Sequence, residues 1–170
     1  DVRKELRKHM ETELGIRVLT GKALEGVVAD KNGVSGKVGD EKLEAEMLLV
    51  GIGRRPVTAG LNLAAVGIET TKQGFIPVTP DQRTARAGIF AIGDVSGGIQ
   101  LAHAATAQGV TAAENAVKGT RKATEPQIPS CIFTAPEIGN VGLGEQAAKD
   151  KGRNVKVAKF HLRGLGKALA

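Results

Sequence analysis

Residues 88–95 read GIFAIGDV, an apolar stretch that ends in a glycine and an aspartate. The pattern predicts a strand over 88–93, and ligands bind at the carboxyl end of such strands in open α/β sheets. Gly93 has no side chain to obstruct a close approach, and the Asp94 carboxylate can accept a charge-assisted hydrogen bond from a sugar or sugar-alcohol hydroxyl. The stretch therefore predicts a site for a polyol-bearing cofactor, although the pattern alone also fits a turn that only ends a strand.

A helix of small residues is expected directly afterwards, over residues 100–118, and Leu101-Ala102-His103 opens it. Its alanines would let a ligand or another backbone pack closely against it. The first turn of a helix presents unpaired N–H groups and a positive partial charge, which would stabilise an electron-rich ring in its reduced form. On the pattern alone, an ordinary buried helix is the alternative.

The N-terminal part predicts a helix followed by short strands. Apolar residues at every fourth position give a helix over 1–14 one apolar face, and Gly15 is expected to stop it. Alternating residues with turns at 30–33 and 39–40 then predict a small antiparallel meander. The strands expected there are 16–20, 22–29, 34–38 and 41–46.

Residues 47–53, MLLVGIG, form a continuous apolar run, which is typical of a strand covered on both faces in a parallel sheet. Arg54-Arg55-Pro56 should end it. Beyond this point the pattern predicts a helix over 61–67 and a strand over 74–79, so the chain mixes both types at α/β spacing. A polar stretch at 119–127 suggests a boundary, with a new strand expected from Ile128.

The composition bounds the class of protein. Hydrophobic residues make up 41% and charged residues 25% of the 170 positions, as in folded globular proteins. No apolar run approaches the ~20 residues of a membrane helix, and no signal peptide opens the chain, so we expect a cytoplasmic protein. The net charge is +6, but the cations are interleaved with acids and only four phenylalanines could stack on bases, which disfavours nucleic-acid binding.

Several reactive side chains are better explained by structural roles. Cys131 is the only cysteine, so it can form neither an internal disulfide nor a dithiol pair, and we expect a small buried hydrophobe. His9 and His161 lack neighbours at metal-ligand spacing. Arg54 and Arg55 are consecutive on an extended turn and should face opposite ways, so at most one would point at a shared ligand.

Four motifs, in this order along the chain, resemble the pyridine nucleotide:disulfide oxidoreductases. DVRKELRKHMETELGIRVLTG (1–21) resembles the later half of their NAD domain, and VGIGRRP (50–56) the strand and turn that lead back to the FAD domain. GIFAIGDV followed by LAHAATAQG (101–109) resembles their second FAD-binding segment, and its LAH form is similar to dihydrolipoamide dehydrogenases. IPSCIFTAPEIGNVGLGEQAAKDKG (128–152) resembles the opening of their dimerisation domain, a likeness that HLRGLGKALA (161–170) continues.

The resemblance implies cofactor-binding positions. The aspartate matching Asp94 binds the ribityl chain of FAD, next to Gly93. The backbone around Ala102, with Leu101 and His103 on either side, meets the pyrimidine edge of the flavin. The nicotinamide nucleotide is bordered by the position matching Ala23 and by the backbone of Gly51, Ile52, Gly53 and Arg54, and a glycine within a strand often marks such a close approach.

The resemblance also implies a domain plan. Residues 1–56 would complete an NAD-binding domain, 57–127 would be the returning segment of an FAD-binding domain, and 128–170 would begin a dimerisation domain. The expected fold class is therefore α/β, with partial FAD/NAD(P)-binding Rossmann-like domains followed by the start of an α+β dimerisation (interface) domain.

The implied activity is oxidation of dihydrolipoamide by NAD⁺ through an active-site disulfide and FAD. The implied partners are dihydrolipoamide or the lipoyl domain of a 2-oxo acid dehydrogenase complex, and a second copy in a homodimer. The family's two Gly-rich fingerprints and its cysteine pair would lie upstream of residue 1, and its catalytic base beyond Ala170. We therefore expect an internal fragment that has no catalytic residue or metal site, is inactive alone and retains FAD weakly. Gly144 stands where relatives carry threonine, which should weaken a helix N-cap.

Other functions stay open at this point. The same motifs fit mercuric or glutathione reductases less closely, and those enzymes differ in residues that this chain does not contain. A catalytically inactive remnant that keeps an interaction surface at 128–170 is a second class. A basic nucleic-acid-binding module is a third.

Overall fold

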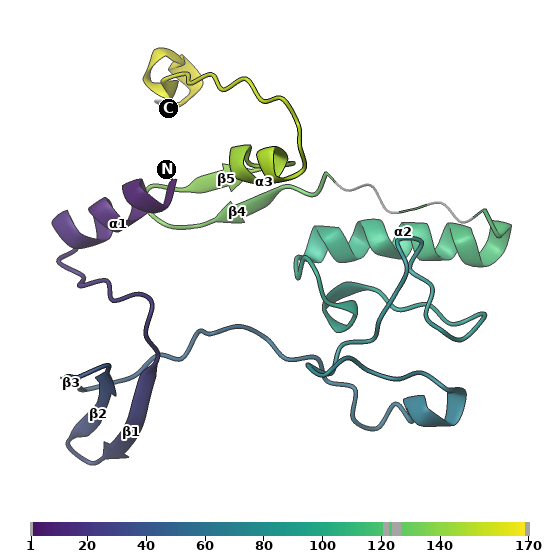
Figure 1. The fold of residues 1–170 in the computed structure, drawn as a ribbon, viewed down its shortest axis with the longest axis horizontal. Helices are drawn as coiled ribbons and strands as arrows, with labels where there is room; N and C mark the ends of the chain where they lie inside the picture. The colour runs from purple at the N-terminus through teal and green to yellow at the C-terminus, as the bar shows by residue number, and fades with distance from the viewer. Residues whose placement is uncertain (1, 121–122, 124–126, 169–170) are drawn as a thin grey trace.

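The computed structural model describes residues 2–120, 123 and 127–168 (Figure 1). Its elements form local groups joined by extended segments. Figure 1 shows a three-stranded sheet and the long helix α2 in separate parts of the molecule, with the strand pair β4–β5 in a third. The mixed α/β content agrees with the expected fold class.

Helix α1 (Val2–Thr12) confirms the predicted N-terminal helix. Gly15 adopts φ +63° after it, and the Ile16 N–H donates to the Met10 carbonyl at 2.8 Å, so the chain turns away where the glycine predicts. The strand predicted over 16–20 is wrong, because a strand requires a neighbouring chain for its hydrogen bonds and no described segment forms a ladder with these residues.

The predicted meander is confirmed by the antiparallel strands β1 (Leu24–Asp30), β2 (Gly33–Val38) and β3 (Glu41–Ala45). The β1–β2 turn holds its shape locally, since the Asn32 N–H donates to the Asp30 carboxylate at 2.7 Å. Gly33 has φ +139°, and a Cβ there would lie 2.5 Å from the Ala45 carbonyl oxygen across the sheet. Only glycine therefore fits this position.

Residues 47–53 do not form the buried strand that their apolar run predicts. They are irregular and exposed, and the side chain of Ile52 is 94% accessible. An apolar run of this kind becomes a strand only when other strands flank it. In the described part of the chain the segment instead leads, extended, from β3 to the central region (Figure 1).

The central region surrounds a small apolar core of Ile68, Ile76 and Ala91. It holds two 3₁₀ turns, η1 (Leu63–Val66) and η2 (Gly93–Ser96), so only a short turn occupies the helix predicted over 61–67. The strands predicted over 74–79 and 88–93 are wrong, since isolated hydrogen bonds replace a ladder. The Ile76 N–H donates to the Val95 carbonyl at 2.9 Å, and Arg83 and Phe90 form a single bridge.

Helix α2 (Ala102–Lys118) confirms the predicted small-residue helix and packs against η2. Four of its side chains are buried: Ala104, Thr111, Ala112 and Asn115. The side-chain amide of Asn115 donates to the Asp81 backbone carbonyl at 3.1 Å. The backbone carbonyl of Asn115 accepts a hydrogen bond from the Arg83 guanidinium at 3.2 Å. The helix is thus tied to the loop that precedes residues 88–95.

The C-terminal part holds β4 (Ser130–Ile132), β5 (Ile138–Asn140), α3 (Glu145–Asp150) and the turns η3 (Leu162–Gly164) and η4 (Gly166–Ala168). β4 begins two residues after Ile128, and most of the predicted boundary at 119–127 lies outside the described residues. Gly144 is the N-cap of α3 and supplies no side-chain cap, as expected. Cys131 is exposed on the two-stranded sheet, so its expected burial is wrong.

No helix within the described ranges is long and apolar enough to span a membrane.

Candidate functional site

Gly93 is the residue of η2 that contacts α2. This residue is buried with φ +70°, and its N–H donates to the Gln108 side-chain oxygen at 2.6 Å. A Cβ on Gly93 would lie 3.3 Å from the Cβ of Ala105, so the glycine and the small helix residue together let the two elements touch. Asp94, the next residue, is thereby held beside the helix.

The carboxylate of Asp94 pairs with Arg54. Their Oδ2 and Nη1 atoms are 2.9 Å apart, although the residues are 40 positions apart in the sequence. The Asp94 side chain is 46% exposed and that of Arg54 is 68% exposed. The pair therefore lies at the surface, where a carboxylate oxygen stays accessible to a hydroxyl group of a ligand.

The first turn of α2 follows η2 along the chain. Leu101 is its extended N-cap residue and supplies no side-chain cap, so the amides that follow keep their capacity to donate. The ring nitrogen Nε2 of His103 lies 2.6 Å from the Pro129 carbonyl oxygen, a contact that links α2 to the segment before β4. A structural role for the His103 ring fits this contact.

The other residues predicted to bind a cofactor do not form a compact site with Asp94 and α2. Gly51, Ile52 and Gly53 belong to the exposed segment that leads to Arg54, and the ideal Cβ positions of both glycines meet no atom within 4 Å. Ala23 is exposed immediately before β1, and Figure 1 shows β1 in a different part of the molecule from α2. The structure thus brings Arg54 to Asp94 and leaves Ala23 apart.

A flavin fits the chemistry of the residues at η2 and α2. Asp94 offers an accessible carboxylate for a polyol hydroxyl, and the opening turn of α2 offers amide donors and a positive partial charge. Gly93, Gly97 and Gly98 all have positive φ values, a conformation that glycine adopts without strain. Gln108 was not among the residues predicted for the site, although its side-chain oxygen accepts the hydrogen bond from the Gly93 N–H. The sequence marks it only as a long polar residue within a run of small ones.

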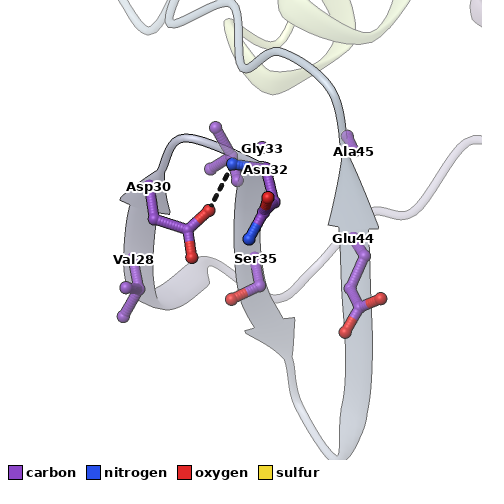
Figure 2. Close-up of a pocket in the computed structure, with 8 residues that line it drawn as sticks. Val28, Asp30, Asn32, Gly33, Ser35, Glu44 and Ala45 are labelled. Carbon is purple, nitrogen blue, oxygen red and sulfur yellow. Dashed lines mark hydrogen bonds between the residues drawn. The ribbon is translucent and has the colours of Figure 1, made fainter.

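A different hollow of about 230 Å³ lies along the β1–β2 turn, lined by Asp30, Asn32 and Glu44 among others (Figure 2). None of the predicted site residues lines it. The Lys42 ammonium donates to Glu44 at 2.7 Å and holds the pKa of that carboxyl below its usual range. In the parts of the chain that the structure describes, no group of three histidine, cysteine or acidic side chains could hold a metal ion.

Comparisons with known proteins show the family of the chain. The family model for the pyridine nucleotide-disulphide oxidoreductases matches residues 1–109, and the model for the dimerisation domain of the same family matches residues 128–170. The chain is 39% identical over 96% of its length to a dihydrolipoyl dehydrogenase of Thermus scotoductus. It is also 39% identical, over its whole length, to a dihydrolipoyl dehydrogenase of Chlorobaculum tepidum.

Among solved structures, LpdA of Mycobacterium tuberculosis superposes with a TM-score of 0.85 over 97% of the chain, at 27% sequence identity. The chain covers 36% of LpdA, 36% of the Thermus protein and 37% of the Chlorobaculum protein. It thus spans a little over a third of the length of the relatives that it matches.

Proposed function

Because this chain belongs to the pyridine nucleotide-disulphide oxidoreductases, we propose that it is part of an FAD-dependent dihydrolipoyl dehydrogenase. The supporting observation is its identity of about two residues in five to proteins of that name over nearly its whole length. Such an enzyme moves two electrons from the dithiol of dihydrolipoamide to NAD⁺, giving lipoamide, NADH and a proton. FAD, when bound, supplies the redox centre between the two substrates.

Asp94 is proposed to hold the flavin by its ribityl chain. The carboxylate accepts hydrogen bonds from the polyol, and the tight contact of Gly93 with α2 sets its position. The amides that follow Leu101, around Ala102 and His103, are proposed to face the pyrimidine edge of the ring. Their positive partial charge would favour the reduced, anionic form.

The backbone of residues 51–54 and Ala23 are proposed to line the nicotinamide nucleotide. Gly53 has φ +123° and no neighbouring atoms around its Cβ position, so a ligand can approach the backbone there. Arg54 joins this segment to the flavin side through its ion pair with Asp94. The two cofactor positions are thereby linked by one side-chain contact.

Residues 128–170 are proposed to contribute to a homodimer interface. They match the family's dimerisation domain, and they carry exposed apolar side chains such as Phe133 and Phe160. Those side chains equally favour a second candidate function, in which a catalytically inactive chain keeps only this interaction surface. The further partners proposed are dihydrolipoamide or the lipoyl domain of a 2-oxo acid dehydrogenase complex, in the cytoplasm.

A chimeric enzyme tests the proposal. The matching third of the Thermus scotoductus relative is replaced by this chain, and the purified product is assayed for bound FAD and for NADH formed from dihydrolipoamide. We expect a yellow, active enzyme. Asp94→Ala in the chimera should reduce both FAD retention and turnover, whereas Asp30→Ala, which changes an acid far from η2, should change neither.

A dimeric, folded chimera without flavin would contradict the proposed cofactor role and would favour the interaction module. Equal loss of flavin in the Asp94 and Asp30 variants would contradict the assignment of Asp94. A complementary measurement mixes the unmodified chain with a full-length relative and follows both by gel filtration. Co-elution of the two proteins, with no flavin bound to the chain, supports the second candidate function.

A further inference from the structure

A hollow of about 520 Å³ lies around α3, in the C-terminal part of the chain. Its volume falls within the roughly 300–1,000 Å³ of small-molecule sites. The hollow combines two cations, one amide and two apolar side chains, and it has no acidic residue. Its lining residues are Gln127, Gly142, Leu143, Ala148, Lys151 and Arg153. It therefore shares no residue with the positions assigned to FAD and the nicotinamide nucleotide.

The end of α3 sets the backbone positions of the two cations. Gly152 follows the helix with φ +70°, and its N–H donates to the Lys149 carbonyl at 2.8 Å. The Arg153 N–H donates to the Ala148 carbonyl at 3.0 Å. These two hydrogen bonds form the Schellman motif, which requires a left-handed residue such as glycine after the helix. The motif fixes Lys151 and Arg153 on either side of Gly152 and satisfies two carbonyls at the helix end.

The two cations of the hollow are not neutralised by nearby acids. The acids of α3, Glu145 and Asp150, accept hydrogen bonds from other residues of the same helix. Among the residues that the structure describes, Lys151 and Arg153 form no ion pair. From residue 151 to residue 170 the sequence contains no aspartate or glutamate. The hollow thus holds positive charge that an anion from outside would balance.

The rest of the wall is apolar. Leu143 is 45% exposed, Ala148 is buried, and Gly142 adds no side chain. An inorganic anion gains nothing from contact with such a surface, whereas an organic anion removes its own apolar atoms from water there. The wall therefore favours an organic acid over phosphate or sulfate.

We propose that this hollow binds a small carboxylic acid whose other end is apolar. The Arg153 guanidinium has a planar pair of donors that matches a carboxylate, and the Lys151 ammonium adds a point charge. The Gln127 side-chain amide adds a neutral donor. Leu143 contacts the apolar end. The proposal does not rest on the flavin or nicotinamide assignments, because those involve other residues.

The test is a titration of the full 170-residue chain with hexanoate at neutral pH, followed by amide chemical shifts in ¹H–¹⁵N NMR spectra. We expect saturable shifts that are largest at residues 142–143 and 148–153. Acetate has the charge without the chain, and 1-hexanol has the chain without the charge. Each should bind more weakly than hexanoate at the same residues.

Substitutions separate the charged from the apolar part of the hollow. Lys151→Gln and Arg153→Gln should each weaken hexanoate binding about threefold, as for exposed charge contacts. Lys156→Gln is the matched control, since it removes an equally exposed cation that does not line the hollow, and it should leave the affinity unchanged. Leu143→Ala should weaken the binding of hexanoate but not of acetate, because it removes apolar contact only.

Equal weakening by Lys156→Gln would overturn the proposal, because net charge alone would then explain the binding. Equal affinities for acetate and hexanoate would overturn it as well, since the hollow would then recognise only charge. Shifts spread over other basic surfaces, or no saturable shift at residues 142–153, would have the same consequence. If the same amides shift when the chain is concentrated without hexanoate, a second copy is the occupant and the proposal fails.

Discussion

The Arg54 guanidinium lies 2.9 Å from the Asp94 carboxylate and connects two segments that are 40 residues apart. One segment resembles the nicotinamide border of the family and the other its flavin-binding turn. The contact therefore joins the two parts of the chain to which the resemblance assigns different cofactors. It also shows which member of the Arg54-Arg55 sequence reaches the acid.

Arg54→Gln should lower the free energy of unfolding by less than about 1 kcal/mol, because both side chains face solvent and exposed ion pairs contribute little. Urea unfolding of Arg54→Gln, Asp94→Asn and the double variant measures the coupling energy. A coupling above about 2 kcal/mol would show that the pair is desolvated in solution, contrary to its exposure here.

Gly93→Ala should destabilise the chain more than Gly98→Ala. Both glycines have nearly the same backbone conformation, with φ +70° and +71°, so each substitution carries a similar left-handed strain of about 1 kcal/mol. Only Gly93 would bring its new Cβ to 3.3 Å from Ala105, whereas no atom lies near that of Gly98. The difference between their urea midpoints therefore measures the packing of η2 on α2. Equal midpoints would mean that this contact is absent in solution.

The elements predicted correctly depend on local chemistry. Helix α2 is hydrogen-bonded within its own small-residue sequence, and the β1–β2 turn is closed by Asp30 and fitted by Gly33. The Gly93-Asp94 turn likewise lies beside the start of α2, as the motif predicts. In each case, the residues that determine the geometry are close in sequence.

The elements predicted wrongly depend on partners. Residues 47–53, 74–79 and 88–93 have the composition of strands, but a strand is completed by its neighbours, and composition does not say whether these are present. The same reason explains why Cys131 is exposed on a sheet of two strands. The Arg54–Asp94 pair could not be predicted either, since nothing local to either residue indicates the other.

Stability should depend on pH through Asp81. The Thr79 hydroxyl donates to its carboxylate at 2.5 Å and Arg83 lies at 3.0 Å, and these contacts, chiefly that of Thr79, hold the pKa of Asp81 below its usual range. A carboxyl whose pKa is lower in the folded chain stabilises it above the unfolded pKa of about 3.9. This contribution is lost as the pH falls through the lower, folded pKa.

Thr79→Val should move the pKa of Asp81 back toward its ordinary value and make the acid dependence of unfolding less steep. A ¹³C NMR titration of the Asp81 carboxyl measures the first effect, and urea midpoints at about pH 7 and about pH 2.5 measure the second. Thr84→Val, which removes a hydroxyl that does not contact Asp81, is the control. An unchanged Asp81 titration in Thr79→Val would assign the lowered pKa to Arg83 instead.

The chain alone should not turn over dihydrolipoamide, because Cys131 is its single cysteine and a redox-active disulfide requires two. With added FAD and NAD⁺, NADH formation should stay at the level of a control without protein, while the chimera with the Thermus relative is active. Cys131→Ser should leave the chimera unaffected, since an exposed thiol on β4 lies outside the proposed site. Turnover by the chain alone that disappears in Cys131→Ser would instead assign chemistry to this thiol, through a disulfide between two copies. Turnover that survives the substitution would show that the electrons reach NAD⁺ without a protein disulfide, and the proposed route would fail.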